Sequence, residues 1–240
     1  MSKMHVLILV AHPDPTHKAT AFRFADSAKA ALEEAGHEVR YVNLMEAGFD
    51  VVASMNDFKR VEMDPFEYPA NQAIPDNLID TIKVQQENLK WSTHVLIFAP
   101  LWFGRLPACF YSFSERVFSF GFAYDGESPL HQNVLKGRKV AIIVSAGVAP
   151  MFFDPKKGNG LDAYLWSAMY GFNYAGFTIL RSLGIYGANS PRRKAMQPEL
   201  QKKINEKLLK LDQWKTVDGE RIYSNFINLE QVFPENILKE

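Results

Sequence analysis

The chain has 240 residues, 47% of them hydrophobic, which is enough to bury one substantial core in a single α/β domain. Its 27 basic and 27 acidic residues cancel, so no overall charge attracts it to nucleic acid or to an anionic membrane. Cys109 is the single cysteine, which excludes an intrachain disulfide and a cysteine-based zinc site and favours a reduced, cytoplasmic setting. The apolar runs are too short to span a bilayer, so we expect no direct membrane insertion.

Buried strands alternate with helices along the chain. Strands are predicted from apolar or alternating runs at residues 5–11, 37–43, 94–99, 139–145 and about 177–187. Helical spacing falls between them at residues 19–35, 76–91, 107–120 and 160–175, with a last helix near 197–211. Strands buried on both faces and separated by helices predict a doubly wound parallel sheet of five strands, with helices on both faces.

Two segments do not fit this alternation. Residues 44–74 are long for a connection and hold several aromatics, so we expect an ordered insertion that closes one side of a site. The tail from Thr216 carries apolar residues without periodicity. We therefore divide the chain into a domain at 1–215 and a C-terminal arm at 216–240, which packs on the domain or on a partner subunit.

The loop after the first strand is a candidate anion site. In parallel sheets, ligands bind outside the carboxyl ends of strands, where a helix N-terminus favours negative charge. Four of its side chains can donate to phosphate oxygens: His12, Thr16, His17 and Lys18. The loop lacks the glycines of the dinucleotide and P-loop fingerprints. An ordinary turn, in which Thr16 caps the next helix, is the alternative.

The loops after the third and fourth strands fit a flat ring. The first of them contains two large aromatics beside a glycine, in the run Pro100, Leu101, Trp102, Phe103 and Gly104. The aromatics could wall an apolar ring, or they could simply plug the end of the sheet. The second is built of Ser145, Ala146 and Gly147, whose small side chains let backbone amides approach a ligand, although a simple turn would look the same.

A block of sequence around the third helix resembles a known family. It comprises Pro100-Leu101, Leu106-Pro107-Ala108, Ser114-Glu115-Arg116-Val117-Phe118 and Phe122-Ala123-Tyr124. This block is similar to one in the NAD(P)H:quinone oxidoreductases, a group that includes the bacterial potassium-efflux ancillary proteins. The spacing holds over about twenty-five residues, and Ala11-His12 followed by Thr16 resembles the family's first phosphate loop. Arg116 is expected to pair structurally, with Glu115 or Asp125.

The resemblance implies a flavodoxin-like fold and a flavin enzyme. Hydride would pass from NAD(P)H to the flavin and then to a quinone-like acceptor that enters the same pocket. FAD is the expected cofactor, with FMN as the alternative, because the insertion and tail could cover an adenosine. His12 and Thr16 would contact the flavin phosphates, Pro100 to Phe103 would lie against the ring, and Ser145 to Gly147 would hold its other end. A homodimer is expected from the aromatic-rich segments at 110–124 and 160–175.

The chain also departs from the family. The resemblance places Phe152 near the substrate pocket, where relatives carry a tyrosine, and either Asn159 or Gly158, depending on gap placement, where they carry a histidine. Neither Phe152 nor Asn159 can relay a proton near neutral pH. No catalytic side chain is therefore assigned. Three alternatives stay open: an ancillary or regulatory flavin subunit of a membrane transport system, a nitro- or azo-compound reductase, and a flavodoxin-type electron carrier.

Overall fold

The computed structural model describes residues 3–48, 50–62, 64–125, 135–154, 160–188 and 190–217. Its strands are β1 (His5–Val10), β2 (Glu38–Asn43), β3 (His94–Pro100), β4 (Lys139–Ala146), β5 (Thr178–Ile179) and β6 (Leu183–Tyr186). They form one parallel sheet in the order β2-β1-β3-β4-β5, and β6 also pairs with β4. The predicted doubly wound parallel sheet is confirmed.

The α-helices in this part of the chain are α1 (Thr20–Glu34), α2 (Tyr68–Ala73), α3 (Asp80–Trp91), α4 (Ala108–Val117), α5 (Gly160–Tyr164), α6 (Trp166–Tyr174), α7 (Pro191–Ala195) and α8 (Gln197–Leu208). Short 3-10 turns are η1 (Leu44–Glu46), η2 (Met55–Asp57), η3 (Pro150–Phe153) and η4 (Leu211–Gln213). The helix expected over 160–175 is thus two helices, α5 and α6.

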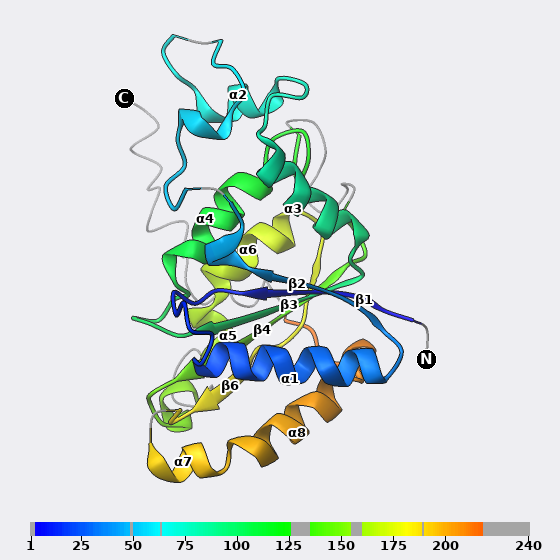
Figure 1. Cartoon of the computed structure of the whole chain (residues 1–240), viewed down its shortest axis with the longest axis vertical. Helices are drawn as coiled ribbons and strands as arrows, with labels where there is room; N and C mark the ends of the chain where they lie inside the picture. Colours follow the sequence, from blue (N-terminus) through cyan, green and yellow to red (C-terminus); the bar gives the residue numbers. More distant parts are fainter. Residues whose placement is uncertain are drawn as a thin grey trace, which may run out of the picture.

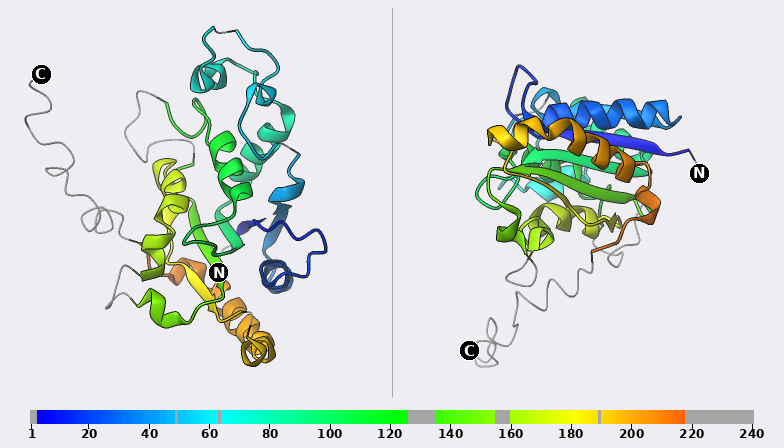
Figure 2. Two further views of the ribbon diagram at one scale, coloured as in Figure 1. Left: turned by 90° about the vertical axis from the view of Figure 1, so that its left-hand side faces the viewer. Right: turned by 90° about the horizontal axis from the view of Figure 1, so that it is seen from below.

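Helices cover both faces of the sheet. The strand residues alternate between two apolar cores, because successive side chains of a strand point to opposite faces. Val6, Ile8 and Val10 of β1 pack with α1 and α8, whereas Leu7 and Leu9 pack with α4 and α6. Figure 1 shows α1 and α8 on one side of the sheet and α3, α4 and α6 on the other, and Figure 2 shows α1 and α8 running side by side.

The last strand is interrupted. The sequence predicts one strand at about 177–187, but β5 and β6 pair with successive parts of β4 and are separated by residues 180–182. Here Arg181 N donates to Lys215 O (3.0 Å) and Ser182 N donates to Asp162 Oδ1 (2.8 Å). These two amides turn away from β4, so the ladder breaks and resumes at Leu183.

The described part of the insertion is joined to α4 by a buried ion pair. Arg116 Nε lies 2.8 Å from Asp57 Oδ1, and both side chains are almost completely buried. The expected structural pairing of Arg116 is correct, but Asp57 was not among the acids considered for it. Figure 1 shows α2 of the insertion beyond α3 and α4, on the side away from α1 and α8.

Only the start of the predicted C-terminal arm can be placed, because residues 218–240 lie outside the described residues. Thr216 forms a bridge with Leu180, and Val217 N donates to Ile179 O (2.8 Å). The described start of the arm therefore lies at the edge of the sheet next to β5.

Candidate functional site

Three loops meet around one cavity at the carboxyl edge of the sheet. The parallel register brings Val10 of β1 beside Phe98 of β3, and Pro100 beside Ser145 of β4. The cavity has a volume of about 440 Å³, within the roughly 300–1,000 Å³ range of ligand sites. It is lined by His12, Lys18, Ala19, Thr20, Arg23, Pro100, Leu101, Trp102, Ser145, Ala146, Gly147, Ala188 and Lys194. The three loops expected from the sequence are thus brought together.

Asp14 organises the first loop. Its Oδ1 accepts hydrogen bonds from Thr16 N (2.9 Å) and Thr16 Oγ1 (2.7 Å), and its Oδ2 accepts from Lys18 N and Ala19 N (both 2.8 Å). These bonds, the Thr16 hydroxyl first, lower the pKa of the Asp14 carboxyl to about 2. Thr16 does not cap α1, because the residue at that position is Ala19 and it makes no side-chain cap bond.

His12 faces the cavity as a neutral donor. Asp14 N donates to His12 Nδ1 (3.0 Å), so in the neutral ring the hydrogen is on Nε2. Burial lowers the pKa of His12, and the nearby Asp14 only partly offsets this effect, which favours the neutral form. The ring is held edge-on between Phe22 and Trp102, with centroids 6.0 and 5.7 Å away.

Thr16 and His17 do not line the cavity. The Thr16 hydroxyl donates to Asp14, and His17 stacks on Phe22 with centroids 4.4 Å apart. The Nε2 atom of His17 lies 3.0 Å from Glu46 Oε1. This contact places η1, the start of the insertion, beside the loop. None of the described residues between 44 and 74 lines the cavity itself, so closure of one side of a site by the insertion stays a prediction.

The second loop is a tight hairpin that presents its aromatics to solvent. Trp102 N donates to Arg105 O (2.9 Å) and Arg105 N donates to Trp102 O (3.0 Å). The two residues between them, Phe103 and Gly104, both have positive φ (51° and 76°), as two-residue hairpin turns require. Trp102 is 44% exposed and Phe103 is fully exposed, so neither plugs the sheet. Trp102 lines the cavity, whereas Phe103 and Gly104 do not.

The third loop lines the cavity as expected, and the segment after β6 completes the wall. Ser145, Ala146 and Gly147 are all lining residues. Ala188 N donates to Ala146 O (3.1 Å), which holds the residues before α7 beside β4 and brings Ala188 and Lys194 to the cavity.

Five lining residues were not expected from the sequence: Ala19, Thr20, Arg23, Ala188 and Lys194. Thr20 and Arg23 are three residues apart and therefore share a face of α1, a spacing that could have indicated them. Nothing in the local sequence indicates that Ala188 and Lys194 lie at the cavity, because only the pairing of β6 with β4 places them here.

The two residues expected near the substrate pocket are not among the described residues that line the cavity. Phe152 of η3 is 65% exposed and does not line the cavity, and Asn159 lies outside the described residues. The neighbouring Phe153 is held by ring contacts with Tyr164 (5.3 Å) and Tyr186 (5.4 Å). Tyr164 in turn abuts the hairpin, since a Cβ added to Gly104 would lie 3.2 Å from its ring.

The donor set of the cavity fits a phosphate-bearing cofactor. None of its lining residues is acidic, and three of them, Lys18, Arg23 and Lys194, are cationic although the whole chain is neutral. The N-terminus of α1 adds a positive dipole end. Fold and site together define a doubly wound α/β protein with a cationic cavity at the carboxyl edge of its sheet.

Comparisons with known proteins agree with this class. A family model described as a flavodoxin-like fold matches residues 4–208. NAD(P)H dehydrogenase (quinone) 1 of Cavia porcellus is 30% identical over 197 residues, which cover 75% of this chain and 68% of the relative. The ribosyldihydronicotinamide dehydrogenase-like protein of Penicillium crustosum is 25% identical over 85% of this chain and 80% of the relative.

A solved structure gives the same result. A candidate quinone reductase from Klebsiella pneumoniae superposes with a TM-score of 0.78 and 26% identity, covering 90% of this chain and 87% of that one. The chain belongs to the NAD(P)H:quinone oxidoreductase family and has its flavodoxin-like fold. Among the described residues, none of the helices has both the length and the apolar character needed to cross a membrane.

Proposed function

We propose that this protein is an FAD-dependent NAD(P)H:quinone oxidoreductase. The observation that carries the proposal is the 440 Å³ cavity, in which cations, a neutral histidine, an aromatic wall and a small-residue loop converge. A flavin held there would supply the redox chemistry, the transfer of a hydride equivalent from NAD(P)H to a quinone, which with one further proton leaves as the hydroquinone.

The protein supplies binding and orientation. His12 offers its Nε2 hydrogen to an anionic group, and its ring supports the indole of Trp102 at the cavity wall. Trp102 provides an apolar surface for a flat ring, and the small side chains of Ser145 to Gly147 let backbone groups reach the polar edge of that ring.

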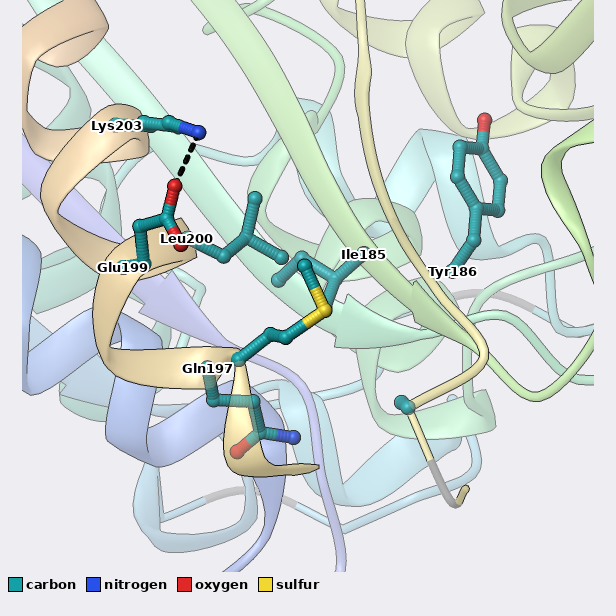
Figure 3. Close-up of a pocket in the computed structure, with 8 residues that line it drawn as sticks. Ile185, Tyr186, Gln197, Glu199, Leu200 and Lys203 are labelled. Atoms are coloured by element: carbon teal, nitrogen blue, oxygen red, sulfur yellow. Dashed lines mark hydrogen bonds and ion pairs between the residues drawn. The ribbon is translucent and has the colours of Figure 1, made fainter. Parts of the chain in front are cut away.

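A second cavity supports FAD over FMN. It has a volume of about 190 Å³ and adjoins the first, because Ala188 lines both. Figure 3 shows Leu200 of α8 facing Ile185 of β6 across it, with Tyr186 turned to the other side of the strand. This cavity is mainly apolar and would suit an aromatic base.

Gln197 places a buried side-chain amide at the second cavity. The side chain is only 5% exposed, and its Nε2 has no hydrogen-bond partner among the residues that the structure describes. A buried amide donor without a partner is costly, and the ring nitrogens of adenine are suitable acceptors. The support for FAD therefore comes from α8 and not from the insertion invoked in the sequence argument.

The proposal is tested by identifying the cofactor and the reaction. Chromatography of the flavin released from purified protein on heating should give FAD, and recovery of FMN alone would contradict the choice of nucleotide. The loaded protein should oxidise NADH or NADPH only while a quinone is supplied. Turnover without any transporter would also argue against a purely ancillary role, whereas failure to bind any flavin after reconstitution would refute the function.

We further propose that the protein is a cytoplasmic homodimer in which each subunit helps to cover the other's site. Tyr170 of α6 is 41% exposed, and it contacts Tyr174, which in turn contacts Tyr124, so a cluster of aromatics lies at the surface. Covering such a cluster is a common use of a subunit interface. Light scattering at micromolar concentration should give about twice 27.3 kDa, and a 27.3 kDa particle would refute the dimer.

A further inference from the structure

The hairpin that carries Trp102 is attached to the rest of the domain at its base. Leu101 N donates to Ser145 O (2.8 Å), and the indole of Trp102 meets the ring of His12 edge-on with centroids 5.7 Å apart. The tip of the hairpin turns at Gly104, beyond these contacts. The position of the Trp102 wall therefore depends also on what packs against the tip.

Tyr164, the last residue of α5, packs directly on this tip. A Cβ added to Gly104 would lie 3.2 Å from Cδ1 of the Tyr164 ring and 3.8 Å from its Cε1. The first of these distances is tighter than ordinary van der Waals contact, so the ring occupies the space that a side chain would need. Glycine is thus required here for two reasons, the positive φ of 76° and the close approach of Tyr164.

Two further rings hold Tyr164 in this place. Phe153 meets it edge-on with centroids 5.3 Å apart, and Tyr186 of β6 stacks on Phe153 with centroids 5.4 Å apart. A Cβ added to Gly184 would overlap the Tyr186 ring, although the φ of Gly184 is not positive. The ring, and not the backbone conformation, therefore excludes a side chain at Gly184. We call Tyr164, Phe153 and Tyr186 the aromatic brace.

Helix α5 is itself held against the sheet. Asp162 Oδ1 accepts a hydrogen bond from Ser182 N (2.8 Å) at the break between β5 and β6. Leu161 and Leu165, on either side of it, are buried in the core. The aromatic brace thus joins an anchored helix and a strand to the hairpin, and at each end a ring lies against the backbone of a glycine. Because protein interiors are close-packed, such a chain of contacts transmits position.

We propose, on the basis of the proposed function, that Tyr164 is a positioning residue that keeps the Trp102 wall at stacking distance from a flat cofactor ring. A gap of about 0.5–1 Å already loses roughly a quarter to a half of the dispersion attraction between two surfaces, so a small movement of the hairpin weakens binding. The ring of Tyr164 carries this role, because its hydroxyl makes no hydrogen bond within the part of the chain that the structure describes.

A double-mutant cycle with Trp102 tests the role through flavin binding rather than activity. Flavin-free proteins are titrated with FAD and with riboflavin, which presents the ring without phosphate, and flavin fluorescence reports binding. Tyr164→Ala should raise both Kd values about fivefold, the effect of one aromatic contact, and Tyr164→Phe should restore them. In the Trp102→Ala background, Tyr164→Ala should add less than about twofold, because the wall that it positions is gone. A general loss of structure would instead add equally in both backgrounds.

Two matched glycine variants test the contact itself. Gly104 and Gly121 have nearly the same φ (76° and 78°), so an alanine carries a similar backbone penalty at either position. A Cβ at Gly121 would meet nothing within 4 Å, whereas one at Gly104 would press on Tyr164. Gly104→Ala should therefore lower the melting temperature more than Gly121→Ala, and Tyr164→Ala should remove most of this difference.

The results separate this proposal from the proposed function. If Tyr164→Ala left flavin binding unchanged, or weakened it equally with and without Trp102, the positioning role would be overturned and the flavin site would stand. Equal melting temperatures of Gly104→Ala and Gly121→Ala would also overturn it. If the wild-type protein bound neither FAD, FMN nor riboflavin, the proposed function would fail, and this role would fail with it.

Discussion

Replacing Asp57 with alanine should destabilise the protein strongly, because the Arg116 guanidinium would be left buried without this counter-ion. Asp57 accepts three hydrogen bonds, from Arg116 Nε (2.8 Å), Tyr68 Oη (2.9 Å) and Ser54 N (2.8 Å). Each bond contributes about 1–1.5 kcal/mol, so losing all three should lower the free energy of unfolding by roughly 3–4.5 kcal/mol. This agrees with the cost of about 3–5 kcal/mol for removing one partner of a buried ion pair.

Urea denaturation followed by tryptophan fluorescence would measure this loss for Asp57→Ala. The control is Glu62→Ala, which removes an acid of the same insertion whose side chain is 51% exposed and lies 2.5 Å from Arg60. Exposed pairs contribute about 0–1 kcal/mol, so the control should change little. In a double-mutant cycle, adding Arg116→Met to Asp57→Ala should cost less than the two single changes summed, by at least about 1 kcal/mol. A loss below about 1 kcal/mol in Asp57→Ala, or additive losses in the cycle, would refute the role of this pair as the lock of the insertion.

Three further predictions concern pH and the site. Burial chiefly lowers the pKa of His94, with Asp212 opposing and Lys139 reinforcing this shift, so the unfolded chain binds more protons below about pH 6.5. The free energy of unfolding should therefore fall as the pH drops from 7 to 5, and His94→Gln should flatten that slope in urea titrations; an unchanged slope would contradict this. Phe152→Ala should weaken acceptor binding about fivefold, the equivalent of one aromatic contact of about 1 kcal/mol, while stopped-flow reduction of the flavin by NAD(P)H persists. Trp102→Ala should release flavin more readily in ultrafiltration, and full retention would argue against stacking.

The sheet and the meeting of the three loops could be predicted because both follow from local patterns. Continuous apolar runs such as Val95 to Ala99 indicate strands buried on both faces, and the carboxyl ends of parallel strands lie at one edge. Any loop that directly follows one of these strands can therefore be expected to lie at the site. The break between β5 and β6 was not predictable in this way, because it depends on Lys215 and Asp162, which are distant in sequence.

The role of each loop residue was harder to predict than the position of its loop. Thr16 looks like a phosphate donor until the Asp14 carboxylate is seen to take its hydroxyl, although an aspartate two residues before a threonine is a known turn pattern. The pairing of Arg116 with Asp57 spans 59 residues and follows from tertiary packing alone. Lys194 reaches the cavity only because β6 pairs with β4.

The neutrality of the chain and the cationic character of its cavity have a joint consequence for recognition. With 27 basic and 27 acidic residues, no net charge steers an anionic ligand from a distance. The field of Lys18, Arg23 and Lys194 extends only about 10 Å at ordinary ionic strength, so it acts after a ligand has entered the cavity. Discrimination for a phosphate-bearing flavin should therefore lie in its dissociation rate more than in its association rate. Added salt should accordingly speed the release of FMN while leaving that of riboflavin unchanged.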